Sequence, residues 1–154
     1  MKIRNIILGI FCFLILLTLT GCGNKNAIST DDFKTITEGR DYIIADATMQ
    51  YSSYGYINEA TIAQSPEGWQ IEFYVLSDES YAEGMFNTNK ATFETYKGNS
   101  SISSSSNMEN YSKYSLTSSG YYMYLCRIDN TLLYVKINDT YEDSVKDLIN
   151  ELGY

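Results

Sequence analysis

Three thiols, Cys12, Cys22 and Cys126, are the side chains best suited to covalent chemistry in this chain. The sequence contains no histidine that could activate them. A cysteine nucleophile needs an activating base that takes the proton of its thiol. Cys126 lies in the run Tyr-Tyr-Met-Tyr-Leu-Cys-Arg-Ile, which has the composition of a strand and supplies no activating base. We therefore interpret Cys126 as a small apolar core residue.

Cys22 stands at the end of an N-terminal segment that has the three parts of an export signal. Lys2 and Arg4 form its basic start, residues 6–17 are apolar apart from a glycine, and it ends in Leu19-Thr20-Gly21-Cys22. The apolar run is shorter than the roughly 20 residues that span a bilayer core. This length favours a cleaved signal over a permanent transmembrane helix.

The ending Leu19-Thr20-Gly21-Cys22 resembles the lipobox of bacterial lipoproteins, which has an aliphatic residue three positions before the cysteine and a small residue directly before it. The resemblance implies cleavage between Gly21 and Cys22 and a diacylglyceryl thioether on Cys22. It also implies a lipid anchor in the cell membrane, with the protein on the extracytoplasmic face. The rest of the chain resembles small uncharacterised lipoproteins of Gram-positive bacteria in size, anchor and acidity.

Composition limits the size and the partners of the part that follows the signal. Removal of residues 1–21 leaves 133 residues, enough for one domain with a hydrophobic core. Loss of Lys2 and Arg4 changes the net charge from −8 to −10, which argues against nucleic acid as a partner. We expect a signal peptide over 1–21, a lipidated cysteine with a short tether over 22–28, and a single α+β domain over 29–154.

The 19 acidic residues leave two functions open besides simple binding. Two carboxylates that meet in space could hydrolyse a cell-wall glycan. An acidic surface could also bind a cationic partner, as an immunity or inhibitor lipoprotein would. The sequence shows no phosphate-binding loop, nucleophile elbow or calcium loop, and it lacks a set of zinc ligands. We therefore name no catalytic residue, metal or cofactor, and expect a non-catalytic binding or interaction module at the cell envelope.

Tyrosine is the compositional excess, with 15 residues, all of them after the predicted signal. Each ring offers apolar area and a hydroxyl, which suits an envelope glycan or a protein partner. A candidate binding surface comprises Tyr51, Tyr54 and Tyr56 in a predicted loop and Tyr111, Tyr122 and Tyr124 in predicted strands. Alternatively, these strand tyrosines simply fill the sheet, where tyrosine is common without any ligand.

Helices that would position these residues are indicated by capping residues followed by apolar stripes. They are predicted over 29–38, 77–97 and 140–152. The first of them opens with Ser29 and Asp32, which have the spacing of a capping box.

Strands are indicated by alternating apolar residues and by β-branched and aromatic side chains. Six are predicted, over 42–49, 58–64, 69–76, 111–117, 121–128 and 131–137. Residues 50–57 and the serine-rich stretch 99–107 are predicted to be loops. Short turns between consecutive strands force antiparallel pairing. The order is therefore α-βββ-α-βββ-α, and the predicted fold class is α+β, with an antiparallel sheet of about five or six strands and helices mainly on one face.

Overall fold

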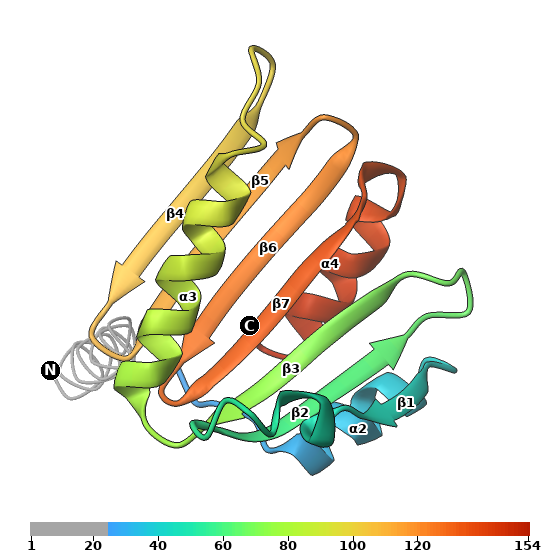
Figure 1. The fold of residues 1–154 in the computed structure, drawn as a ribbon. Coiled ribbons are helices and arrows are strands. Elements are labelled where there is room, and N and C mark those ends of the chain that lie inside the picture. The colour runs from blue at the N-terminus through green and yellow to red at the C-terminus, as the bar shows by residue number, and fades with distance from the viewer. Residues whose placement is uncertain (1–24) are drawn as a thin grey trace, which may run out of the picture.

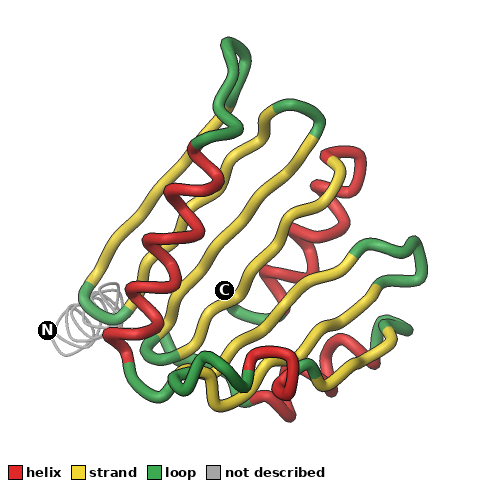
Figure 2. The backbone as a smooth tube through the Cα atoms, in the orientation of Figure 1, coloured by secondary structure: helices red, strands yellow, loops and turns green. Residues whose placement is uncertain are grey.

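The structure is a computed structural model that describes residues 25–154, so the predicted signal peptide and Cys22 lie outside the described residues. Within these described residues, seven strands and three α-helices follow one another, and Figures 1 and 2 trace their course. The strands are β1 (Ile43–Asp46), β2 (Ile57–Gln64), β3 (Gln70–Leu76), β4 (Ile102–Met108), β5 (Tyr111–Ser118), β6 (Tyr121–Ile128) and β7 (Thr131–Asn138). The helices are α2 (Thr30–Glu38), α3 (Glu79–Glu94) and α4 (Glu142–Glu151), with short 3-10 turns η1 (Thr48–Tyr51) and η2 (Asp139–Tyr141).

All seven strands form one sheet in the order β1-β2-β3-β7-β6-β5-β4, and every neighbouring pair is antiparallel. The α+β prediction is confirmed, with seven strands instead of five or six. Two meanders meet in the middle, where Phe73 of β3 lies opposite Leu133 of β7. Asp129 and Asn130 are residue types that tolerate positive φ, which predicts a two-residue hairpin turn. They form that turn between β6 and β7, where Asp129 has a positive φ of 49°.

Helices cover both faces of the sheet. The prediction of helices mainly on one face holds for α2 and α4, which share a face, whereas α3 crosses the other (Figure 1). β6 is covered on both faces, because every residue from Tyr122 to Ile128 is buried. β3 shows the same arrangement. Ile71 and Phe73 alternate in the sequence with Glu72 and Tyr74, which predicts only the first pair in the core, yet Tyr74 is 3% exposed.

The prediction that the serine-rich stretch 99–107 is a loop is wrong for most of its residues. Residues 102–108 form β4, an edge strand that pairs with β5 from Ile102 opposite Thr117 to Met108 opposite Tyr111. Every residue of β4 is exposed, so no alternation of apolar and polar residues marks it in the sequence. The free edge of β5 supplies the backbone partners that make this segment a strand.

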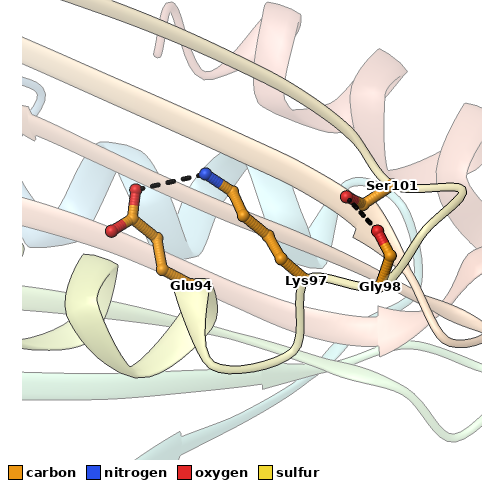
Figure 3. Close-up of polar contacts among 4 residues, drawn as sticks. All are labelled: Glu94, Lys97, Gly98 and Ser101. Carbon is orange, nitrogen blue, oxygen red and sulfur yellow. Dashed lines mark hydrogen bonds and ion pairs between the residues drawn. The ribbon is translucent and has the colours of Figure 1, made fainter.

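Side-chain caps fix the helix ends that the sequence indicates. The Ser29–Asp32 capping box is confirmed, and its hydrogen bonds from Ser29 lower the pKa of Asp32. At the far end of α3, Lys97 forms an ion pair with Glu94 at 3.4 Å, and Ser101 donates a hydrogen bond to the Gly98 carbonyl at 3.0 Å (Figure 3). These contacts lead the chain from α3 into β4. Within residues 25–154, no helix has the length and apolarity that a membrane crossing would require.

Candidate functional site

A pocket of about 440 Å³ lies between the segment that follows β1 and the part of α3 from Ser80 to Asn89. Its size is within the range typical of small-ligand sites. Three of the predicted binding tyrosines, Tyr51, Tyr54 and Tyr56, line it together. We call it the tyrosine pocket. Its other lining residues are Ile57, Ser80, Tyr81, Gly84, Met85, Thr88 and Asn89.

The wall formed by residues 48–57 is held against β2 by short-range hydrogen bonds. The Thr48 backbone N–H donates to the Asp46 carboxylate at 2.9 Å. A hydrogen bond from the Thr48 side chain, followed by this backbone bond, lowers the pKa of Asp46. The Ala60 N–H donates to the Thr48 hydroxyl at 3.1 Å. Two successive turns follow, with Tyr54 N–H donating to the Tyr51 carbonyl and Ile57 N–H donating to the Tyr54 carbonyl. The turns fold this short segment into one wall and bring its three tyrosines together.

Four aromatic rings form a continuous series along the pocket. Tyr56 stacks on Tyr81 of α3, with ring centroids 4.9 Å apart and planes 7° from parallel. Tyr54 lies 5.8 Å from Tyr56 and 6.4 Å from Tyr51. Tyr54 and Tyr81 are 50% and 48% exposed, so the series presents aromatic surface to solvent. The Asp78 cap of α3, which accepts from the Tyr81 N–H at 3.0 Å, fixes the start of the second wall.

A carboxylate lies behind this aromatic wall. The Tyr74 hydroxyl is hydrogen-bonded to the Glu72 carboxylate and, at 2.9 Å, to the Tyr51 hydroxyl. Burial, followed by the negative charge of Glu72, raises the pKa of Tyr74. Because an ionised carboxylate only accepts, the single Tyr74 proton serves Glu72, and Tyr51 donates to Tyr74. The charge of Glu72 is thus connected to the pocket through two phenols.

The strand tyrosines are a correction to the predicted binding surface. Tyr111, Tyr122 and Tyr124 are only 7%, 3% and 2% exposed, and they belong to the core between the sheet and α4. They fill the sheet, as the alternative interpretation held. Tyr81, by contrast, stands near the apolar stripe of the helix predicted over 77–97, which predicts a core position, yet it is half exposed and lines the pocket. Cys126 is a buried core residue as predicted, and burial raises the pKa of its thiol to about 11.

Lysines occupy the faces of many other tyrosines. Six of the seven lysines in residues 25–154 lie over a tyrosine ring, at distances from 4.0 Å for Lys136 over Tyr96 to 5.9 Å for Lys97 over Tyr114. None of these rings belongs to the tyrosine pocket, and no lysine or arginine of the described residues lines it.

The start of α3, whose residues line the pocket, lies at the same end of the sheet as the first described residues (Figure 1). Backbone and side-chain hydrogen bonds connect the two in series. They run from Ser77 N–H to the Tyr56 carbonyl, from Leu76 N–H to the Asn130 carbonyl, from Asp129 N–H to the Asn110 carbonyl, and from the Asn110 amide to the Lys25 carbonyl at 2.7 Å. Ala27 and Ile28, predicted as part of a tether, pack against the core.

A second pocket of about 440 Å³ lies beside Ala27, Glu59 and Asn130, but no aromatic ring lines it. Across the part of the chain that the structure describes, no group of three or more histidine, cysteine, aspartate or glutamate side chains is placed to hold a metal ion. The tyrosine pocket is therefore the stronger candidate site.

No protein-family model matches the chain, and no curated protein matches it. A solved structure that does match is described as the crystal structure of a GTP binding regulator from Thermotoga maritima. It is 22% identical, covers 79% of this chain and 84% of its own, and has a TM-score of 0.47. A likeness at this level assigns no ligand and no activity to this chain.

Proposed function

We propose that this protein is a lipoprotein anchored through Cys22 to the outer face of the cell membrane, where its folded part binds a ligand non-catalytically in the tyrosine pocket. The observation that carries the proposal is the series of four rings around a 440 Å³ hollow, two of them half exposed. Exposed aromatic surface that gathers in a concavity is typical of a binding site. The lipobox at 19–22 supports the anchor.

The position of Lys25, the first residue that the structure describes, supports a site close to the membrane. Cys22 precedes Lys25 by three residues, which span at most about 11 Å when extended. Lys25 is tied to the folded part through its carbonyl and through its ammonium group, which donates to the Gly153 carbonyl at 3.0 Å. A lipid on Cys22 would therefore hold the pocket end of the sheet near the bilayer.

The anchor is tested by metabolic labelling with a radioactive fatty acid followed by membrane fractionation. We expect label in the membrane-bound wild-type protein and none after Cys22→Ser, because the serine hydroxyl cannot form the thioether. Cys12→Ser is the matched control, since Cys12 precedes the predicted cleavage point, and it should keep the label. Equal labelling of Cys22→Ser and wild type would refute the lipid anchor.

The pocket is tested with the mature lipidated protein in maltoside micelles. NMR titration uses three probes, a chitin tetrasaccharide, choline, and the uncharged choline isostere 3,3-dimethyl-1-butanol. Binding of any of them should shift the pocket resonances and should be lost in the double variant Tyr54→Ala/Tyr81→Ala. Tyr121→Ala, which removes a ring that is 42% exposed outside the pocket, should bind like wild type. If none of the three probes binds, or the double variant binds as well as wild type, the pocket is not the site.

A further inference from the structure

The chemistry of the tyrosine pocket suggests which ligand it takes. We infer that the pocket binds an organic cation, an alkylammonium or quaternary ammonium group, whose charge lies against the tyrosine rings. This inference rests on the proposed binding function and specifies its ligand class. Three independent features of the described residues carry it: the open rings, the absence of a basic side chain in the lining, and the carboxylate behind Tyr51.

Open aromatic faces attract cations because the face of a ring carries negative charge density. Quaternary ammonium groups are recognised in this way, by several aromatic rings around one apolar cation. Tyr51, Tyr54, Tyr56 and Tyr81 line one pocket, in which Tyr56 and Tyr81 cover one face of each other and Tyr54 and Tyr81 are half exposed. Ile57 and Met85 add apolar surface for the alkyl carbons of the ligand.

The chain itself shows that its tyrosine faces take cations. Lys136 lies 4.0 Å from the ring centroid of Tyr96, and Lys25 lies 4.9 Å from that of Tyr111. The four rings of the tyrosine pocket have no such lysine among the described residues. In a chain that covers so many of its other tyrosines with ammonium groups, the exposed aromatic surface of this pocket is available to a cation that comes from outside.

Glu72 places a negative charge two hydrogen bonds behind the pocket wall, and no counter-charge pairs with it among the described residues. Within residues 25–154, the ion pairs are Arg40–Glu151, Lys97–Glu94 and Lys146–Glu142, so Glu72 has no cationic partner there. Its carboxylate is hydrogen-bonded to Tyr74, and Tyr74 to Tyr51 in the pocket wall. A hydrogen-bond chain that ends on a carboxylate makes each phenol ring in it richer in electrons, which strengthens its attraction for a cation.

An uncharged sugar would use the pocket less well. Sugars need several polar side chains directed at their hydroxyls, and the amide of Asn89, in the pocket lining, already donates to the Met85 carbonyl at 2.9 Å. The remaining polar side chains of the lining are the phenols and the hydroxyls of Ser80 and Thr88. This lining favours an apolar cation over a hydrated polyol.

Choline and 3,3-dimethyl-1-butanol have nearly the same shape and differ in charge, so calorimetric titration of both separates charge from fit. With the mature lipidated protein in maltoside micelles, we expect choline to bind at least about tenfold more tightly than the neutral isostere. Tyr81→Phe should retain this preference because the ring remains, whereas Tyr81→Leu should lose most of it. Glu72→Gln should weaken choline alone, and Tyr121→Leu should change neither.

Equal affinity for the two isosteres, or tight binding of a chitin tetrasaccharide without choline, would overturn the cation inference while the binding function stands. Failure of all three probes would overturn the binding function itself. A lipid headgroup and a free cation are distinguished by reconstitution in nanodiscs. If free choline binds the protein in phosphatidylglycerol discs but not in phosphatidylcholine discs, the lipid headgroup occupies the pocket. If free choline binds equally well in both kinds of disc, the ligand is a soluble cation.

Discussion

Buried phenols should make this protein unfold steeply at alkaline pH. Tyr74, Tyr122, Tyr124 and Tyr154 are each no more than 3% exposed, and burial raises the pKa of each above its ordinary value of 10.0. Below pH 10 these groups are neutral in both the folded and the unfolded chain, so they leave stability unchanged. Above pH 10 the unfolded chain loses protons that the folded chain keeps, and the free energy of unfolding falls.

The size of this fall follows from the number of phenols. Each raised group costs about 1.4 kcal/mol per pH unit, and the four together cost about 5.5 kcal/mol per pH unit. A domain with about 10 kcal/mol of stability at neutral pH would therefore unfold near pH 12. Ionisation of the folded state does not rescue it over this interval, because the pKa values of these four groups are raised so far by burial.

Urea unfolding followed by near-UV circular dichroism, from about pH 9 to about pH 11.5, measures this slope. Tyr124→Phe keeps the ring and removes one titrating phenol, so the slope should fall by about 1.4 kcal/mol per pH unit. The comparison of slopes cancels the effect of the substitution on stability at neutral pH. Stability that stays constant to about pH 11.5, or identical slopes for the variant and wild type, would refute the reasoning.

Two further predictions concern the packing and the capping of the helices. Leu148→Ala should lower the free energy of unfolding by about 2–5 kcal/mol in urea titrations, because Leu148 is fully buried between α4 and the sheet. Asp147→Ala, at an exposed neighbouring position of α4, should change it by no more than about 0.5 kcal/mol, and a similar loss in both variants would contradict the packing argument. Ser29→Ala should cost about 1 kcal/mol through loss of the α2 capping box, and no loss in urea titrations would show that the cap is dispensable.

Local signals predicted most of the fold, because several of its elements are determined by neighbouring residues. The Ser29–Asp32 pair fixes the start of α2 within one turn of chain, and Asp129 fixes a hairpin within two residues. The alternation of Ile71 and Phe73, which are 0% and 1% exposed, correctly identified one face of β3 as core. The burial of Tyr74 on its other face depends on α3, which alternation alone does not reveal.

β4 shows why the remaining strand was missed. A strand is recognised from sequence through the burial of one or both faces, and β4 buries neither. Its backbone pairs with β5, and the Ser112 hydroxyl donates to the Asn107 side chain at 2.5 Å. These contacts join residues that only the completed sheet brings together, whereas serine-rich composition by itself is typical of a loop.

Of the six tyrosines predicted to form a binding surface, three line the tyrosine pocket. Tyr54 and Tyr56 fall in one short segment, so their proximity follows from the chain itself, and the structure places both in the pocket. Tyr81 belongs to a helix and reaches the pocket because Asp78 caps that helix just past the end of β3. Tyr122 and Tyr124 have the same residue type and a strand-like setting, yet α4 covers them. Residue type identifies the candidate tyrosines, and tertiary packing determines which of their rings remain exposed to solvent.

The anchor and the pocket become more informative together than either is alone. If Cys22 carries lipid, its distance from Lys25 leaves too little chain for the pocket end of the sheet to turn far from the bilayer. The body then carries a net charge of −10, which an anionic membrane surface repels. A pocket of open rings backed by the unpaired Glu72 is suited to cations, and cations are concentrated beside an anionic surface. The short anchor would thus hold the site where its inferred ligand class is most abundant.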